Sequence, residues 1–335
     1  MQKLTGSEYL LPLSSGTAAL QLALKVLGVG KGDYVACSTF TYAASAFPVT
    51  YIGATPIFID SEPDTWNMDP FVLEKAINEL RASGFRLRAI IAVHIYGMPC
   101  DIESLVEVGK KYYIPVIEDA AESIGSTIGG QHTGTFGDLG VLSFNGNKII
   151  TTSGGGALLG KNPEYISYAK KLASQAREEG AGYTHQEIGY NYLMGNINAA
   201  VGLGQVEVLN KRIKRRREVF EIYKSELSDL EVGFQNEPED SFSNRWLICV
   251  LFKDFKIREK GRLALEQNHI ESRPLWKPMH LQPVFKDADY FGGNVADGLF
   301  NRGLCLPSGT AITEQDLGRI IEIIKKVFNR RGRKG

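Results

Sequence analysis

The strongest constraint on the fold is an alternation of two kinds of segment along the first half of the chain. Short apolar runs rich in β-branched residues are separated by stretches with helical periodicity. Buried strands are expected at residues 34–40, 55–60, 87–97, 115–121 and 139–144, and helices at 69–81 and 102–112. Alternating buried strands and helices indicate an α/β fold with a mostly parallel sheet, because parallel strands need crossover connections.

The chain of 335 residues is long enough for two domains. A long helical pattern spans residues 198–230, a polar stretch follows at 235–244, and a second, smaller α/β pattern begins at Arg245. We therefore expect a large domain over 1–205 and a small C-terminal domain over 206–335, which includes the long bridging helix.

Charge and cysteine content exclude several classes of partner. The 38 basic and 38 acidic residues cancel, which gives no electrostatic reason to bind nucleic acid or an anionic membrane. The four cysteines are scattered without a CxxC pair, which argues against a metal site or a disulfide framework. No apolar run has the length of a membrane span. We expect a cytoplasmic protein without a metal.

Small residues precede an apolar helix near the N-terminus. Ser14, Ser15, Gly16 and Thr17 come directly before the helical pattern at 18–27. The free N–H groups at the start of a helix bind phosphate, and small residues let the phosphate approach. A serine or threonine at this position is more often only an N-cap, so this segment alone does not define a phosphate site.

Carboxylates follow one of the predicted buried strands. Glu118, Asp119 and Glu122 come directly after apolar residues. A carboxylate at the end of a buried strand is costly unless a cation compensates it, and a protonated pyridine nitrogen is such a cation. An ordinary helix cap is the alternative that this segment leaves open.

A single lysine follows another strand. Lys148 lies between the strand that ends near Ser143 and a glycine-rich return, Gly154–Gly156, and its neighbours are apolar or small. A partly desolvated lysine is protonated less readily and can form a Schiff base. The nearby Ser143 hydroxyl can donate to a phosphate. The glycines match neither a dinucleotide fingerprint nor a P-loop.

Together, these three segments resemble the DegT-type sugar aminotransferases. The resemblance runs from Leu4 to about Lys326. It implies the fold of aspartate aminotransferase, which is fold type I of the enzymes that use pyridoxal 5′-phosphate (PLP). Within the family, the chain is most similar to C4-aminotransferases that act on UDP-2-acetamido-4-keto-2,6-dideoxyhexose for bacillosamine-type sugars in bacterial glycans or exopolysaccharide. The motifs behind this finer resemblance lie at 143–156, 174–177, 244–246, 273–277 and 305–309.

The resemblance implies roles for the residues around the cofactor ring. Lys148 corresponds to the Schiff-base lysine, and Asp119 to the carboxylate that keeps the pyridine nitrogen protonated. Glu122 is expected near the 3-hydroxyl of the ring. Tyr42 matches the aromatic position that stacks on the ring, although an aromatic residue after a strand is more often part of the core.

The resemblance also implies a phosphate site and a partner subunit. Gly16, Thr17 and Ser143 correspond to residues that hold the cofactor phosphate. Asn191 matches an asparagine that reaches the phosphate of the neighbouring subunit, which implies a homodimer with shared active sites.

Substrate-binding residues are predicted less sharply. His280 is a candidate for contact with the sugar nucleotide, and Arg273, like Arg245, for contact with its diphosphate. The other candidates for the substrate pocket are Ser308, Gly309 and Thr310. His94 is expected to be a packed histidine at the end of a strand.

The implied reaction is a ping-pong transamination with L-glutamate as amino donor and Lys148 as the proton carrier. A PLP-dependent sugar dehydratase is one alternative, but such relatives have histidine in place of Lys148. The family also departs from this chain in two places. Members usually have a few tens of residues before the position of Met1, and arginine at the position of Leu193. A truncated, non-catalytic protein with the PLP fold is therefore the second alternative.

Overall fold

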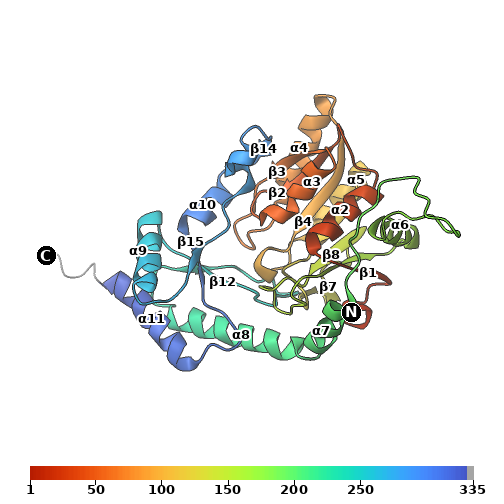
Figure 1. Cartoon of the computed structure of the whole chain (residues 1–335). Coiled ribbons are helices and arrows are strands. Elements are labelled where there is room, and N and C mark those ends of the chain that lie inside the picture. The colour runs from red at the N-terminus through yellow and green to blue at the C-terminus, as the bar shows by residue number, and fades with distance from the viewer. Residues whose placement is uncertain (330–335) are drawn as a thin grey trace.

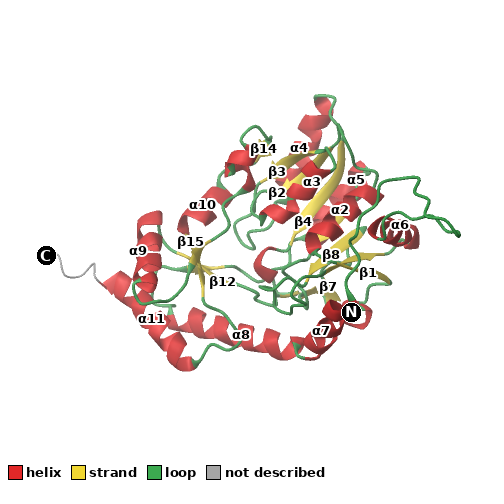
Figure 2. Ribbon diagram, in the orientation of Figure 1, coloured by secondary structure: helices red, strands yellow, loops and turns green. Residues whose placement is uncertain are grey.

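A mixed eight-stranded sheet organises the larger lobe of the molecule (Figures 1 and 2). The computed structural model describes residues 1–329. The strand order is β1-β9-β8-β5-β4-β2-β3-β14. The strands are β1 (Tyr9–Leu13), β2 (Tyr34–Ser38), β3 (Thr55–Ile59), β4 (Leu87–Val93), β5 (Val116–Asp119), β8 (Leu139–Ser143), β9 (Gly156–Gly160) and β14 (Tyr290–Phe291). Neighbours from β8 to β14 are parallel, whereas β9 is antiparallel to both β1 and β8.

Helices cover both faces of this sheet, as expected for a mostly parallel sheet. One face packs against α2 (Gly16–Val26), α3 (Phe47–Tyr51) and α6 (Pro163–Ala173). The opposite face packs against α4 (Pro70–Ala82) and α5 (Ile102–Tyr112). The α/β fold predicted from the alternating pattern is therefore confirmed.

The C-terminal part forms a smaller lobe around a four-stranded sheet of order β10-β12-β15-β13. Helices α8, α9 and α11 pack on this sheet (Figure 1). The remaining helices are α1 (Gln2–Thr5), α7 (Asn196–Glu207), α8 (Leu209–Glu226), α9 (Phe255–Glu266), α10 (Val295–Arg302) and α11 (Glu314–Asn329). The remaining strands are β6 (Thr127–Ile128), β7 (Gln131–His132), β10 (Gly233–Phe234), β11 (Ser241–Phe242), β12 (Ile248–Leu251), β13 (Arg273–Pro274) and β15 (Gly303–Leu306). No helix within residues 1–329 is both long and apolar enough to cross a membrane.

Two of the predicted elements were wrong in detail. The single helix expected over 198–230 is divided at Val208, whose ψ of 1° separates α7 from α8. The strand expected over 87–97 ends at Val93, and a short 3-10 helix follows at Ile95–Gly97. Tyr96 there has a left-handed φ of 57°, and its N–H bonds to a side chain instead of a neighbouring strand.

The C-terminal part also returns to the large sheet. Strand β14 pairs in parallel with β3 at the edge of the large sheet, and Asp60, which follows β3, is buried. The carboxylate of Asp60 accepts backbone N–H groups at 3.0–3.1 Å from Gly293, Val295 and Ala296 at the start of α10. The two lobes are therefore joined by side-chain and strand contacts as well as by the chain between α7 and α8.

The topology brings several strand ends to one edge. Because β2, β4, β5 and β8 are parallel, their carboxyl ends share an edge of the sheet. Strand β1 runs in the same direction as β8, since both are antiparallel to β9. Helix α2 therefore begins at this edge. Ligands of α/β proteins collect at such an edge.

Candidate active site

Lys148 lies on the turn after β8, and its side chain is only 11% exposed. Its Nζ lies 3.6 Å from Oε1 of Glu122 and 4.0 Å from the ring centroid of Trp246. The indole Nε1 of Trp246 donates to the carbonyl of Asn147 at 3.0 Å, which fixes the ring beside the lysine. A carboxylate and an aromatic face both attract an ammonium group, so two partners hold Lys148 in place.

Glu122 is a buried carboxyl group next to Lys148. Its Oε2 accepts the backbone N–H of Tyr96 at 2.7 Å. Burial raises the pKa of Glu122, whereas the charge of Lys148 and the N–H of Tyr96 lower it. A carboxyl group with a raised pKa beside an amine can accept or return a proton there. Its expected position near the 3-hydroxyl of the cofactor stays a prediction.

Asp119 ends β5 and is 4% exposed. The hydroxyl of Ser45 donates to its Oδ2 at 2.7 Å, and the N–H of Ala121 donates to its Oδ1 at 3.2 Å. The hydroxyl of Thr41 lies 2.7 Å from that of Ser45 and continues this chain of contacts. His94 lies beside Glu118, and Lys148 lies beside Glu122. Within residues 1–329, no basic side chain pairs with Asp119.

This arrangement fits the expected cofactor. The two hydrogen bonds from Ser45 and Ala121 offset only part of the lost hydration of this buried carboxylate, and a protonated pyridine nitrogen would supply the missing positive charge. The amine needed to hold the cofactor aldehyde is present in Lys148. The donor set around Asp119 and Lys148 therefore suits PLP.

Glu118 precedes Asp119 but has a different set of partners. Its two oxygens accept three backbone N–H groups at 2.6–2.7 Å, those of Gly134, Phe136 and Gly137. Its Oε2 also lies 3.0 Å from Nε2 of His94. Glu118 is fully buried, so these donors replace water. The residue fastens the loop at 133–137 next to the strand end that carries Asp119.

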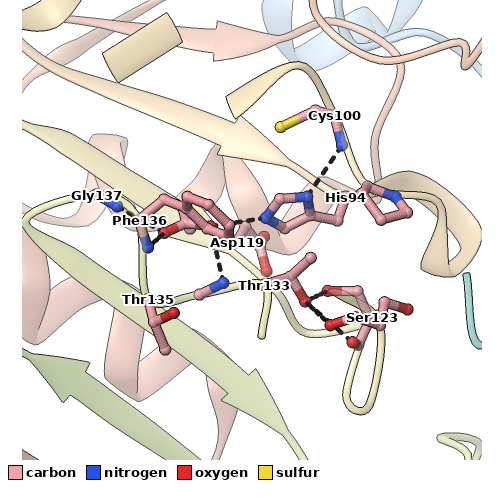
Figure 3. Close-up of polar contacts among 12 residues, drawn as sticks. His94, Cys100, Asp119, Ser123, Thr133, Thr135, Phe136 and Gly137 are labelled. Atoms are coloured by element: carbon pink, nitrogen blue, oxygen red, sulfur yellow. Dashed lines mark hydrogen bonds and ion pairs between the residues drawn. The ribbon is translucent and has the colours of Figure 1, made fainter. Parts of the chain in front are cut away.

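His94 is the packed histidine that the sequence predicted. Burial lowers the pKa of His94, but Cys100 and Glu118 together raise it to about 10. A second proton on the ring would have to occupy Nδ1, which already accepts an N–H group. The N–H of Cys100 donates to Nδ1 at 3.1 Å, as Figure 3 shows, so Nδ1 carries no proton. The neutral ring therefore donates from Nε2 to Glu118. Both ring nitrogens are used within the scaffold, and none is left for a substrate.

The residues predicted to bind phosphate meet where β1 and β8 end. Helix α2 begins at Gly16, and Ser15 is its N-cap, accepting from the N–H of Ala18 at 3.0 Å. A Cβ atom on Gly16 would lie 3.1 Å from Cβ of Ser143, so glycine permits this close approach. The helix start and the hydroxyl groups of Thr17 and Ser143 form a place suited to a phosphate.

Aromatic side chains form a wall beside the site. Tyr42 is 57% exposed, and its ring centroid lies 5.6 Å from that of Trp276. The ring centroid of Trp276 lies 5.6 Å from that of the buried Tyr96, and the backbone N–H of Trp276 donates to the Tyr96 hydroxyl at 2.8 Å. An exposed ring backed by packed rings is suited to stack on a flat ligand. The stacking role of Tyr42 stays a prediction.

His280 is engaged within the chain. Its Nδ1 lies 2.6 Å from Oγ1 of Thr39, and its Nε2 lies 3.1 Å from Oδ1 of Asp297. Its ring stacks on Tyr290 with centroids 3.8 Å apart. Burial lowers the pKa of His280, and Asp297 opposes this effect. The contact with the sugar nucleotide stays a prediction, and it would require His280 to release one of these partners.

The remaining substrate candidates lie in the small lobe. Arg273 is exposed and binds Glu271 at 2.7 Å. Ser308 is 5% exposed and lies 3.5 Å from Nη1 of Arg216, which also donates to the carbonyl of Trp246. Arg216 thereby connects Ser308 to Trp246, whose ring lies beside Lys148. The other two candidates, Gly309 and Thr310, directly follow Ser308.

Asn191 lies on an exposed segment between α6 and α7. Its backbone bridges to Ser174, and Leu193 bridges to Leu13 at the end of β1. The side chain of Asn191 is exposed on the described chain. Its predicted role in a neighbouring subunit stays a prediction.

Three residues of the site were not predicted from the sequence. Trp246 and Trp276 lie in motifs that carried the resemblance, but the sequence assigned neither a role. Ser45 follows Tyr42 by three residues, which was a weak signal that the serine returns to the same strand edge. The structure brings Ser45 to Asp119 because a short 3-10 helix begins directly after Tyr42.

Curated relatives match nearly the whole chain. Residues 1–325 match the model of the DegT/DnrJ/EryC1/StrS aminotransferase family. EpsN of Bacillus subtilis (strain 168), named a pyridoxal phosphate-dependent aminotransferase, is 47% identical over 322 residues, which are 95% of this chain and 83% of EpsN. A GDP-perosamine synthase of Escherichia coli O157:H7 is 38% identical over 322 residues, covering 96% of this chain and 86% of the relative.

Solved structures agree with these relatives. A DegT DnrJ EryC1 StrS aminotransferase from Brucella abortus superposes with a TM-score of 0.92 at 29% identity, covering 97% of this chain and 87% of that one. Spr1654 from Streptococcus pneumoniae, named a sugar aminotransferase and solved in its PLP form, has a TM-score of 0.89 at 28% identity, covering 98% and 89%. The predicted fold type and cofactor are thereby confirmed. The chain belongs to the DegT/DnrJ/EryC1/StrS aminotransferase family and is a PLP-dependent sugar aminotransferase.

Proposed function

We propose that the chain transfers an amino group from L-glutamate to the C4 ketone of a nucleotide-linked 6-deoxy sugar, UDP-2-acetamido-4-keto-2,6-dideoxyhexose. The observation that carries the proposal is the grouping of Lys148, Asp119 and Glu122 at one sheet edge, beside the start of α2. The four free cysteines are compatible with a cytoplasmic site for the reaction. The product would serve bacterial glycan or exopolysaccharide synthesis.

Each residue at this edge has a separate task in the proposed reaction. Bound PLP supplies an electron sink for the negative charge that develops on the carbon bearing the amino group. Lys148 holds the cofactor and, once released, carries a proton at Nζ. Glu122, 3.6 Å from this nitrogen, balances its charge and can share its proton. The face of Trp246 limits where the released amine can move.

Asp119 has the task of holding a proton on the pyridine nitrogen. Ser45 and Ala121 occupy one position on each carboxylate oxygen and orient the group. A carboxylate oxygen accepts more than one hydrogen bond, so each still has room for a further donor. At the other end of the cofactor, the start of α2 and Ser143 would hold the phosphate.

The names of relatives support a nucleotide-linked sugar but differ on the nucleotide. Several relatives are GDP-perosamine synthases, and a relative from Acidithiobacillus ferrooxidans, 31% identical, is named a UDP-N-acetyl-3-dehydro-alpha-D-glucosamine 3-aminotransferase. Our choice of a UDP-linked 4-keto sugar rests on the resemblance at 143–156, 174–177, 244–246, 273–277 and 305–309. A GDP-linked keto sugar is therefore the competing substrate in any assay.

A homodimer is part of the proposal, and α7 supports it. This helix buries none of its residues within one chain. Ile197 is 82% exposed and Leu203 71%, which is costly for large apolar side chains unless a partner covers them. The helix also contacts the segment between β8 and β9 that carries Lys148, because Asn198 donates to the carbonyls of Thr152 and Gly154 at 2.6 and 3.1 Å. A partner on α7 would lie close to Lys148.

The donor half of the reaction is tested first. The PLP-loaded protein is mixed with L-glutamate without any sugar, and 2-oxoglutarate is measured together with the visible absorbance of the cofactor. We expect about one 2-oxoglutarate per active site, followed by turnover when the UDP-linked keto sugar is added. Lys148→Ala should abolish both, and Lys211→Ala, an exposed lysine on α8, should change neither. Bound PLP that ignores glutamate would favour the non-catalytic alternative, and turnover with the GDP-linked sugar alone would refute the proposed nucleotide.

The shared site is tested by mixing two inactive variants. If Asn191 acts in the neighbouring subunit, a mixed dimer of Lys148→Ala and Asn191→Ala contains one intact site, so activity should reappear on mixing. Leu203→Glu should convert the dimer to monomers in light scattering, and Phe71→Glu, which is 75% exposed on α4, is the matched control. A dimer that survives Leu203→Glu would refute this interface, and mixtures without activity would refute the role of Asn191.

A further inference from the structure

The structure brings together two cysteines that are far apart in the sequence. Cys249 on β12 and Cys305 on β15 are register partners, and their Sγ atoms lie 3.5 Å apart. The other two cysteines, Cys37 and Cys100, are buried in the large lobe. The sequence alone showed only scattered cysteines, because the pairing depends on the order of strands in the small sheet.

The two cysteines face each other at a non-hydrogen-bonded position of the antiparallel pair. Beyond the named strands, the N–H of Phe252 donates to the carbonyl of Arg302 opposite it at 2.9 Å. Hydrogen-bonded and non-bonded pairs alternate along an antiparallel ladder, so the pair Cys249 and Cys305, three steps further along, is non-bonded. At such a position the Cα atoms lie about 4.5 Å apart, within the range of about 4.4–6.8 Å that a disulfide needs. The strands need not separate or slide for the sulfurs to bond.

The two thiols differ in access. Cys305 is partly exposed, whereas Cys249 is 4% exposed. Burial and the adjacent Cys305 raise the pKa of Cys249. An oxidant therefore meets Cys305 first, and Cys249 is the neighbour able to complete a disulfide. Because the thiolate is the attacking species, this second step should become faster as the pH rises.

The pair lies behind the wall of the active site. Cys249 and Cys305 belong to the same apolar cluster as Tyr96, Trp246 and Trp276. Burial raises the pKa of Tyr96, and both cysteines add to this effect. The hydroxyl of Tyr96 accepts the backbone N–H of Trp276. The backbone N–H of Tyr96 donates to Glu122, which lies beside Lys148. A contiguous set of contacts thus joins the two sulfurs to the catalytic lysine.

We propose that Cys249 and Cys305 form a redox-modification site at which a peroxide converts the two thiols to a disulfide and so lowers activity. The thiolate of Cys305 attacks hydrogen peroxide, which gives a sulfenic acid and hydroxide, and the thiolate of Cys249 then displaces hydroxide from that sulfur. In total, two thiols and one peroxide give one disulfide and two waters. The peroxide is reduced and both sulfurs are oxidised. A dithiol reductant reverses the modification.

The chemical test does not depend on the amino-transfer proposal. The PLP-loaded protein is treated with hydrogen peroxide, the remaining thiols are blocked, and thiols and peptides are analysed. We expect two of the four thiols to be lost and one cross-linked pair of peptides that contains Cys249 and Cys305. Cys305→Ser, a small change at a partly exposed position, should give no cross-link, and Cys100→Ser should give the same cross-link as the native chain. Oxidation of Cys305 to sulfinic acid without a cross-link would overturn the proposal, as would a cross-link to Cys37 or Cys100.

The effect on the site is read out in two ways. Peroxide should change the tryptophan fluorescence of the native chain and lower the rate of amino transfer, and dithiothreitol should restore both. Neither quantity should respond to peroxide in Cys305→Ser. The activity readout rests on the proposed function, whereas the fluorescence readout, to which Trp246 and Trp276 contribute, does not. A cross-linked protein with unchanged fluorescence and activity would overturn the coupling to the active site.

Discussion

Replacing Glu118 with glutamine should destabilise the chain strongly, although the side chain keeps its shape. Glu118 is fully buried and accepts four hydrogen bonds, two on each oxygen. In Glu118→Gln, one oxygen becomes an amide NH₂ group that faces two donors. If it takes the Oε1 position, the N–H groups of Phe136 and Gly137 lose their acceptor. If it takes the Oε2 position, Gly134 and His94 lose theirs.

The size of the effect follows from these contacts. A hydrogen bond to a charged group contributes about 1.5–3 kcal/mol, so the loss of two predicts a decrease of about 3–6 kcal/mol in the free energy of unfolding. The N–H of Cys100 holds the neutral ring of His94 with its proton on Nε2, so a change of tautomer cannot rescue the contact without a further loss.

The measurement is a urea titration followed by far-UV circular dichroism. Glu107→Gln, an exposed position on α5, is the matched control and should stay within about 0.5 kcal/mol of the native chain. If the free energy of unfolding of Glu118→Gln lies within about 1 kcal/mol of that control, the carboxylate does not hold the loop at 133–137 as we infer. A large decrease with unchanged slope of the titration would support it.

Three further predictions concern the site. Ser45→Ala leaves Oδ2 of Asp119 without its donor and should weaken PLP binding by about tenfold, a cost of about 1.4 kcal/mol. An equilibrium titration with PLP measures this change, and Ser225→Ala on α8 is the control that should leave binding unchanged. Burial raises the pKa of Glu122, so the folded chain keeps that proton to higher pH than the unfolded chain. Stability should therefore fall as the pH rises above the ordinary value of 4.5 and through the raised pKa, and Glu122→Gln should flatten this slope in thermal unfolding; equal slopes would contradict the raised pKa. Gly16→Val places a methyl-bearing Cβ 3.1 Å from Ser143 and should cost about 1–3 kcal/mol of stability and weaken PLP binding, whereas unchanged binding would remove the argument for this glycine.

The parts of the fold that depend on local pattern could be predicted. The strands that end at Asp119 and Ser143 are short and apolar, and polar residues directly after them mark the sheet edge. The same logic placed Lys148 and the start of α2, because parallel strands bring their ends together. Assignment to PLP needed the family resemblance, since a buried carboxylate and a lysine are compatible with several chemistries.

The parts that depend on long-range packing could not be predicted. Trp246 reaches Lys148 from another lobe, and only the fold determines that contact. The break at Val208 was missed because the polar and apolar residues of α7 and α8 form one continuous pattern in the sequence. In the fold, α8 buries residues such as Phe220 against the small sheet, whereas α7 buries none.

The contacts of Asp60 and β14 have a consequence for how the chain unfolds. A large lobe cut off near residue 205 would lose the strand that covers β3 and the three N–H groups that Asp60 binds. It would then hold a carboxylate, 1% exposed in the whole chain, without most of its donors. We therefore expect neither lobe to be stable by itself, because each is stabilised partly by contacts with the other. We therefore expect the two lobes to unfold in a single cooperative transition. Any opening of the site should keep the contacts of Asp60 and β14 and rotate the lobes about them, rather than separate the lobes.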